Sequence, residues 1–196
     1  MIERAGIRFN ELPDEEFDPI FGISTGAGVI FGATGGVMEA ALRTAVETIT
    51  GKTAETIEFT DVRGTEGVKE AEYDINGLKV KVAVASGLVN ARKVLDMVKS
   101  GEKDYTFIEI MGCPGGCVNG GGQPIQPASV RNFVDLKGLR AAALYKDDEN
   151  LPIRKSHENP VIKTLYDEYF EKPGSHRAHE ILHTHYVARP KVNVNK

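Results

Sequence analysis

The chain has 196 residues, enough for one domain with a hydrophobic core, or for one domain with a small appendage. Its hydrophobic content of 41%, charged content of 27% and net charge of -4 are typical of a globular protein and provide no basic surface for nucleic acid or anionic lipid. No apolar run is long enough to span a membrane, and the first residues lack the apolar core of a secretory signal. We therefore expect a cytoplasmic protein without nucleic-acid or membrane partners.

The first part of the chain predicts an extended lead-in, a glycine-rich turn and a long helix. Residues 1–20 form the lead-in, and the turn covers 21–36, with the sequence FGISTGAGVIFGATGG. A helix is expected to begin near Thr34 and to end at Gly51, since glycine commonly follows the last helical turn. Its apolar residues recur at spacings of three and four: Met38, Ala41, Leu42, Ala45, Val46 and Ile49.

The middle of the chain predicts strands around one further helix. Strands are expected at 56–62, 70–75, 78–85 and 105–110, and Asn76-Gly77 predicts a tight hairpin between the second and third of them. A helix over 88–99 should be closed by Gly101. A second glycine-rich loop covers 114–124.

The last part predicts helices at 128–135 and 138–147, with the charged run 146–150 on a solvated face. A polar tail follows, with short helices at 160–171 and 175–185. We expect two parts, residues 1–150 and residues 151–196. The fold class predicted is α/β, a mixed sheet flanked by helices with a short helical C-terminal tail. Both glycine-rich loops lie at strand–helix junctions, where ligands bind in such folds.

Two cysteines mark the second loop, which reads EIMGCPGGCVNGGGQP over 109–124. Thiolates are the soft ligands that iron–sulfur clusters need, and amide N–H groups after Pro114 can stabilise a thiolate at Cys113. Gly115 and Gly116 remove side chains that would collide with a cofactor. Cys117 supplies the second thiol.

Other interpretations of these cysteines remain open at this point. Cysteine is often buried for packing alone, so Cys113 and Cys117 fit two structural residues beside a turn. A zinc site would need further ligands, and no histidine has suitable spacing to complete it. A 4Fe–4S cluster uses four cysteines, twice the number in this chain.

Three ordered segments resemble iron-only (FeFe) hydrogenases. They are FGATGGVMEAALR at 31–43, the cysteine segment at 109–124, and the tail RKSHENPVIKTLYDEYFEKPGSHRAHEILHTHY at 154–186, which resembles the small-subunit segment of that family. The resemblance covers nearly the whole chain. It implies one lobe of the catalytic domain of an enzyme that reversibly combines two protons and two electrons into hydrogen.

The resemblance also implies a cofactor and its ligands. The family's H-cluster is a 4Fe–4S cubane linked to a diiron subsite that carries CO, cyanide and a dithiolate. Cys113 would ligate the cubane, and Cys117 would bridge the cubane and the diiron subsite. Met111 would pack against the diiron subsite as the catalytic-site residue of this chain, and Phe31, Gly32 and Ala33 would line it.

The family's other two cluster cysteines, and most of its proton pathway, belong to segments that lie before the ones matched here. We therefore expect an inactive part of the enzyme whose H-cluster is absent or incomplete without the N-terminal half. Ferredoxin or NAD(P)H-linked redox subunits would be electron partners. An exposed apolar, glycine-rich face at 21–36 and 111–124 would favour self-association. The alternative function is a hydrogenase-like iron–sulfur scaffold or interaction subunit without the diiron site.

The tail contains one further motif. Residues 179–183 read HEILH, the HExxH pattern of zinc proteases, which would place two imidazoles on one helical face. No suitable third ligand follows, and the hydrogenase-like tail accounts for these residues better.

Overall fold

The protein is described by a computed structural model that covers residues 1–15, 24–64 and 66–189. The start of the predicted glycine-rich turn, at 21–23, lies outside these residues, as do the last residues of the lead-in. Residues 1–15 are exposed and contain two short 3-10 turns, η1 (Glu3–Ala5) and η2 (Phe9–Glu11).

A three-stranded mixed sheet lies at the centre of the fold, in the order β1-β2-β3. The strands are β1 (Val68–Ile75), β2 (Leu78–Ser86) and β3 (Phe107–Met111). β1 and β2 form the predicted antiparallel hairpin, whose turn residues Asn76 and Gly77 have φ of 55° and 85°, as a type I′ turn requires. β2 and β3 are parallel and are joined by α3 (Leu88–Lys99).

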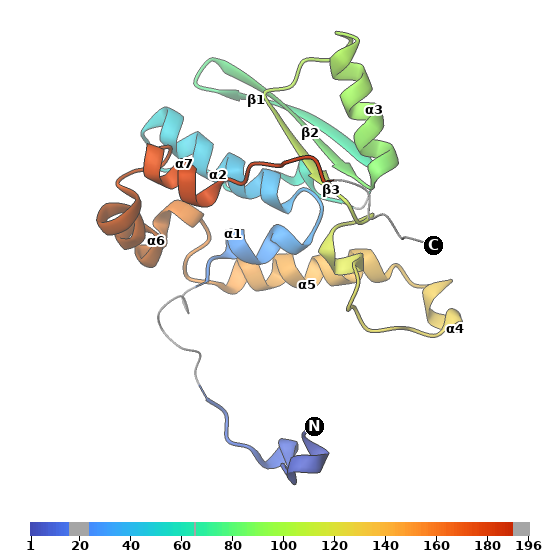
Figure 1. Cartoon of the computed structure of the whole chain (residues 1–196). Coiled ribbons are helices and arrows are strands. Elements are labelled where there is room, and N and C mark those ends of the chain that lie inside the picture. The colour runs from blue at the N-terminus through green and yellow to red at the C-terminus, as the bar shows by residue number, and fades with distance from the viewer. Residues whose placement is uncertain (16–23, 65, 190–196) are drawn as a thin grey trace.

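Helices cover both faces of the sheet because β2 is apolar on both sides (Figure 1). Val80, Val82 and Val84 pack toward α2 (Gly36–Thr50), which supplies Met38 and Leu42. Ala83 and Ala85 alternate with them and pack on α3 through Val94. The predicted mixed α/β fold is thus confirmed. As predicted, Gly51 ends α2, in the left-handed conformation.

A further layer lies under α2. It consists of α1 (Gly26–Val29), η3 (Ile30–Gly32) and α5 (Leu136–Asn150), with α4 (Ala128–Arg131) before α5. The predicted turn over 24–36 is therefore mostly short helical segments. The packing is close enough that a Cβ on Gly26 would lie 1.8 Å from a carboxylate oxygen of Asp148. Asp148 is fully buried, so the prediction of a solvated run at 146–150 is wrong for this residue.

The strand predicted at 56–62 is also wrong. This segment is irregular and contains only the 3-10 turn η4 (Thr60–Val62). The carbonyl of Ile57 accepts a hydrogen bond from Arg43 Nε at 2.9 Å, and Phe59 and Val62 enter the core beside α2. Only Phe59 and Val62 of this segment thus fill the core, from an irregular backbone.

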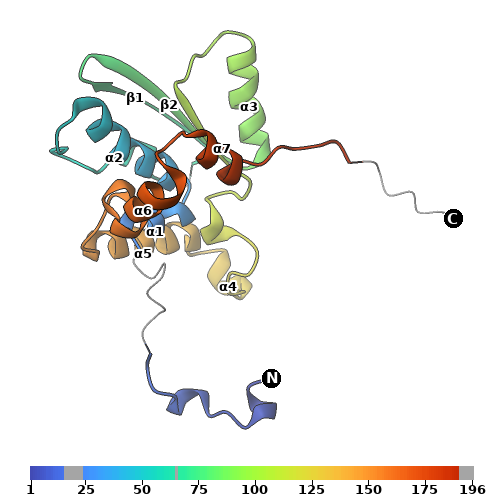
Figure 2. The same ribbon diagram turned by 60° about the vertical axis from the view of Figure 1, so that its left-hand side comes forward.

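The C-terminal tail packs back on this body. It comprises η6 (Ser156–Glu158), α6 (Pro160–Leu165), the π-helix η7 (Tyr166–Phe170) and α7 (His176–Leu182). Gly26 N–H donates to Ile153 O at 2.8 Å, and two views place α6 beside α1 and α2 (Figure 1, Figure 2). The short helical tail is therefore confirmed.

Candidate functional site

The two glycine-rich loops, far apart in the sequence, touch through their backbones. Thr34 N–H donates to Gly115 O at 3.1 Å. Gly116 has φ of 98°, and a Cβ there would lie 2.7 Å from both Gly32 O and Thr34 N. Glycine at 116 is therefore required by both its backbone conformation and this close contact.

The cysteine loop begins directly where β3 ends. Cys113 and Cys117 are exposed free thiols, and Gly116 N–H donates to Cys113 O at 3.0 Å, which closes a turn between them. The side-chain amide of Asn119 donates to Pro114 O at 3.0 Å. These bonds present two thiols on one short, folded loop.

The other predicted site residues lie on the two sides of the contact between the loops. Phe31 is 45% exposed, whereas Ala33 is buried. Gly32 faces both Gly116 and α5, where a Cβ would lie 2.7 Å from Leu144 Cδ1. Met111, at the end of β3, is half-buried, and its carbonyl accepts from Gly87 N–H at 2.8 Å.

The cysteine loop has the donor chemistry and the open space that an iron–sulfur cluster needs. Two thiolates are soft ligands for iron. Added Cβ atoms at Gly112 and Gly121 would meet no atom within 4 Å, so space is free on this loop. Cys113 Sγ lies close to the backbone of Gly120, where a Cβ would be 3.6 Å away. The donor set fits half of a four-cysteine site.

Two buried charged residues behind this site were not predicted: Glu109 and Lys69. Glu109 is a carboxylate within an otherwise apolar strand, a signal that was available in the sequence. Lys69 Nζ donates to Thr34 O at 3.1 Å and to Gly64 O at 2.8 Å. Burial lowers the pKa of Lys69 to about 8, and the negative charge of Glu109 opposes this effect.

The expected apolar face is only partly where it was predicted. No large apolar side chain among residues 111–124 is exposed, so that part of the prediction is wrong. The apolar surface instead includes Phe31 and continues along α2 through Ala41, Ala45 and Ile49, which line a hollow of about 550 Å³. α2 thus has one face in the core and another at the surface.

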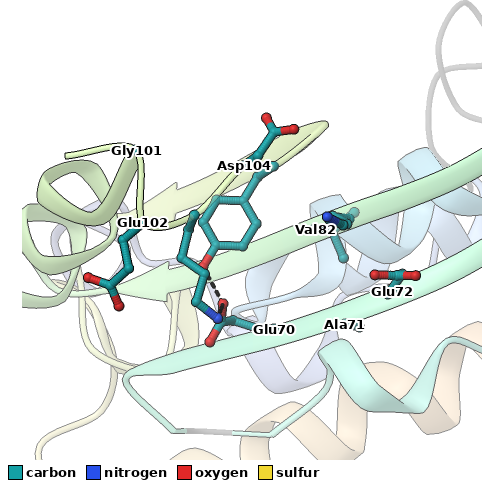
Figure 3. A pocket seen from close by; sticks show the side chains of 10 residues that line it. Glu70, Ala71, Glu72, Val82, Gly101, Glu102 and Asp104 are labelled. Carbon is teal, nitrogen blue, oxygen red and sulfur yellow. Dashed lines mark hydrogen bonds and ion pairs between the residues drawn. The ribbon is translucent and has the colours of Figure 1, made fainter. Parts of the chain in front are cut away.

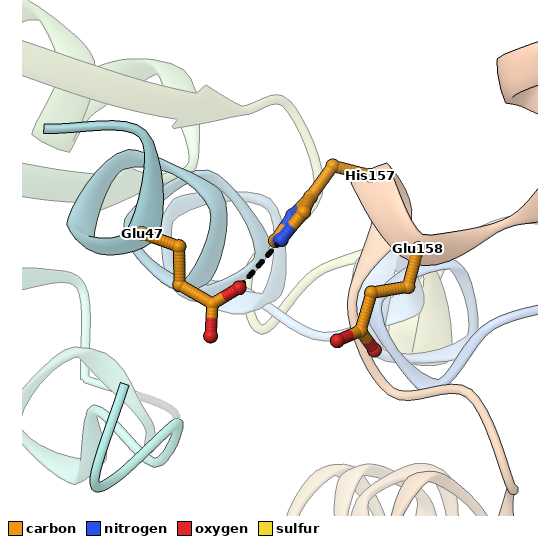
Figure 4. Close-up of side chains that lie close together, drawn as sticks. All are labelled: Glu47, His157 and Glu158. Carbon is orange, nitrogen blue, oxygen red and sulfur yellow. Dashed lines mark hydrogen bonds and ion pairs between the residues drawn. The ribbon is translucent and has the colours of Figure 1, made fainter. Parts of the chain in front are cut away.

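A second group of possible metal ligands joins the tail to α2 (Figure 4). Ligand atoms of Glu47, His157 and Glu158 lie within 4.8 Å of one another. Lys155 Nζ, however, lies 2.8 Å from Glu47 and 2.6 Å from Glu158. Its ammonium already pairs with both carboxylates, and His157 bonds to Glu47 at 2.7 Å, so the group forms a tail-docking ion network.

A separate hollow of about 480 Å³ lies on the sheet and contains none of the predicted site residues (Figure 3). Glu70 accepts a hydrogen bond from the hydroxyl of Tyr105 there and pairs with Lys103 at 3.0 Å.

The HExxH pattern at 179–183 is incomplete as a helix, because α7 ends at Leu182 and His183 has extended backbone dihedrals. None of the helices in the described part of the chain has both the length and the hydropathy of a membrane span.

Two family models of iron-only hydrogenases match most of this chain, including the cysteine loop. The family described as "Iron only hydrogenase large subunit, C-terminal domain" matches residues 1–121, and "Iron hydrogenase small subunit" matches residues 134–189. The chain belongs to the iron-only hydrogenase family. The resemblance seen in the sequence is therefore confirmed.

Hydrogenases of known sequence and structure support this assignment. The chain is 52% identical over 187 residues to Iron hydrogenase 1 of Clostridium pasteurianum, covering 95% of this chain and 32% of that protein. It is 48% identical over 192 residues to the NADP-reducing hydrogenase subunit HndD of Solidesulfovibrio fructosivorans, covering 98% and 32%. A structure of FeFe-hydrogenase HydA1 from Chlamydomonas reinhardtii superposes with a TM-score of 0.69 at 42% identity, covering 95% and 53%. The chain thus spans about a third of the length of these two curated hydrogenases.

Relatives of a second kind match the chain over a similar length at lower identity. Protein NAR1 of Arabidopsis thaliana is 32% identical over 191 residues, covering 95% of this chain and 40% of that protein. More distant matches are named as cytosolic iron–sulfur cluster assembly factors. The chain is therefore similar in sequence to hydrogenases and to proteins named as assembly factors.

Proposed function

We propose that this chain is the C-terminal half of the catalytic domain of an FeFe hydrogenase. The complete enzyme would interconvert hydrogen with two protons and two electrons. The observation that carries the proposal is the cysteine loop at the end of β3, where two exposed thiols adjoin the backbone of the first glycine-rich loop. The chain would supply two of four H-cluster cysteine ligands and be inactive without the N-terminal half.

Each site residue has a proposed role. Cys113 would ligate the cubane, and Cys117 would bridge the cubane and the diiron subsite. Their exposure and their place on one folded loop support both roles. The H-cluster, when bound, supplies the redox chemistry at iron.

The remaining residues shape the diiron side of the site. Phe31, Gly32, Ala33 and Met111 line it, and Phe31 presents an exposed aromatic ring that can exclude water. Gly32 leaves room for the contact with Gly116.

We also propose the division into residues 1–150 and 151–196. In favour of this division, α5 is part of the layer under α2, whereas the tail contacts that body through ion pairs and backbone hydrogen bonds. The partners proposed are the N-terminal half of the domain and a ferredoxin or NAD(P)H-linked redox subunit. The NADP-reducing relative supports the second kind of partner. Cytoplasmic location and self-association belong to the same proposal.

Complementation tests this function. The chain would be expressed together with the N-terminal part of a hydrogenase domain, in a host that matures such enzymes, and hydrogen evolution measured. The pair is expected to evolve hydrogen, and the chain alone to evolve none. Hydrogen evolution by the chain alone would contradict the proposal. So would an inactive pair in a host where an intact relative is active.

A second candidate function is an iron–sulfur scaffold without the diiron site, which the identity to NAR1 favours. Anaerobic iron and sulfide analysis of the isolated chain separates the two candidates. A stable, stoichiometric cluster in this chain alone would favour the scaffold, with cysteines from a second copy completing it. Met111 and the higher identity to hydrogenases, 52% against 32%, favour the hydrogenase.

A further inference from the structure

Glu109 connects strand β3 directly to the start of α2. It lies between two isoleucines of β3 and is 5% exposed. One carboxylate oxygen accepts from Gly35 N–H at 2.7 Å and the other from Met38 N–H at 2.7 Å. Both oxygens of a buried carboxylate are thus used at the first turn of one helix.

This arrangement is electrostatically favourable. The first N–H groups of a helix have no partner within the helix, and the helix dipole favours an anion there. Gly35, which precedes α2, has no side chain that could cap these groups. Glu109 therefore replaces a local cap by one from a distant strand, while Lys69 places a positive charge on the adjoining Thr34 carbonyl.

The same residues also adjoin the cysteine loop. Thr34 N–H donates to Gly115 O, which lies between the two cysteines in the sequence. Glu109 stands two residues before Met111 on β3. The strand, the cysteine loop and the turn at Thr34 and Gly35 therefore form a closed ring of contacts, with the Glu109 carboxylate as one link.

We propose that Glu109 is a positioning residue that holds the cysteine loop and the segment 31–33 in register with each other. The inference rests on the proposed function, since these two segments are the proposed cluster-binding elements. It goes beyond helix capping, because removing the carboxylate should loosen a contact that Glu109 does not itself make. That contact is the hydrogen bond from Thr34 to Gly115.

Amide hydrogen exchange of the isolated, cluster-free chain tests the proposal. The variant is Glu109→Gln, which keeps the side-chain volume but loses the charge and one of two acceptors. Exchange at Thr34, Gly35 and Met38 is compared with exchange at Val82 of the central strand, which reports global unfolding. The matched control is Glu72→Gln, at an exposed glutamate of the same sheet that pairs with Lys79 at 3.5 Å.

We expect exchange at all three amides to accelerate by at least about tenfold relative to Val82, the effect of losing one hydrogen bond to a charged group. The alkylation rates of Cys113 and Cys117 should change as well, although Glu109 bonds to Gly35 and Met38 and to neither cysteine. The control should change neither. Faster exchange at Gly35 and Met38 with unchanged protection at Thr34 and unchanged alkylation would show a helix cap only, and would overturn the proposal.

The unmodified chain provides a second measurement, in case the variant does not fold. If Glu109 links these segments, the amides of Thr34, Gly35 and Met38 open together and show one common opening free energy over a denaturant series. Independent opening of Thr34 would overturn the proposal. Neither measurement requires a bound cluster or the evolution of hydrogen gas, so failure here leaves the hydrogenase assignment intact. Failure of the complementation experiment likewise leaves this result intact.

Discussion

Arg43 and Asp148 form a bidentate ion pair, and both side chains are completely buried. Nη1 and Nη2 of the guanidinium lie 2.8 Å from Oδ1 and Oδ2 of the carboxylate. The pair joins α2 to α5. Glu39 adds a bond to Arg43 at 2.8 Å, and Arg154 one to Asp148 at 2.6 Å, so the network extends to the tail. Because Gly26 packs on Asp148, the network also supports the first glycine-rich loop.

Removing one partner of this pair should strongly destabilise the fold. Asp148→Ala leaves the Arg43 guanidinium buried without its main counter-ion, and such losses cost about 3–5 kcal/mol. The free energy of unfolding, measured by urea denaturation of the chain, should fall by this amount.

An exposed pair on the same chain is the control. Lys79 and Glu72 lie 3.5 Å apart at the surface of the hairpin. Glu72→Ala should change the free energy of unfolding by less than about 1 kcal/mol. If Asp148→Ala were equally mild, the buried network could not be what fixes α5 on α2.

Gly116 should be irreplaceable, whereas nearby Gly121 should tolerate a side chain. A Cβ on Gly116 would collide with the backbone of the first loop at a φ of 98°, whereas a Cβ on Gly121 would meet no atom within 4 Å. Gly116→Ala is therefore expected to cost at least about 1–3 kcal/mol and to separate the loops. Gly121→Ala should remain within about 0.5 kcal/mol of the parent. Thermal unfolding of both variants measures this difference in stability, and amide exchange at Thr34 reports whether the loops separate. Equal stability and equal exchange in the two variants would show that Gly116 does not make this close contact.

The docking of the tail should depend on pH through Glu47. Hydrogen bonding to the Lys155 ammonium, with help from Ala54 N–H and His157, lowers the pKa of Glu47 from 4.5 to about 2. A carboxyl group with a lowered pKa in the folded state stabilises that state above its unfolded pKa. This contribution should therefore be complete above about pH 4.5 and disappear as the pH falls toward about 2.

Hydrogen exchange of peptides from residues 160–170, compared with core peptides, measures this docking. The unmodified tail should lose protection through that pH window. In Glu47→Gln the tail should already be less protected at neutral pH. Its protection should also change less than that of the unmodified tail between about pH 4.5 and about pH 2. An unchanged acid profile in Glu47→Gln would show that other groups hold the tail.

Much of the fold followed from local sequence signals. Asn76-Gly77 predicted the hairpin because few other pairs adopt two successive positive φ values. Gly51 and Gly101 predicted helix ends for a similar reason. The cysteine loop was recognisable through its resemblance to a hydrogenase segment, because two thiols among glycines also fit two structural cysteines beside a turn.

The errors arose where distant residues decide the structure. Asp148 looked solvated in a charged run, but its partner Arg43 lies on another helix far away in the sequence. The segment 56–62 has strand-like composition. However, Arg43 donates a hydrogen bond to its Ile57 carbonyl, and its Phe59 and Val62 side chains pack in the core. Glu109 looked like one polar residue in a strand, because its two N–H partners belong to a helix more than seventy residues earlier.

We propose Cys117 as a cluster ligand of a hydrogenase. The decisive measurement is hydrogen evolution by the complete, matured catalytic domain that carries Cys117→Ala, with Glu72→Gln at the exposed hairpin as control. We expect that the Cys117→Ala domain evolves no hydrogen and that the Glu72→Gln domain stays active. Hydrogen evolution by Cys117→Ala at the parent rate would contradict it.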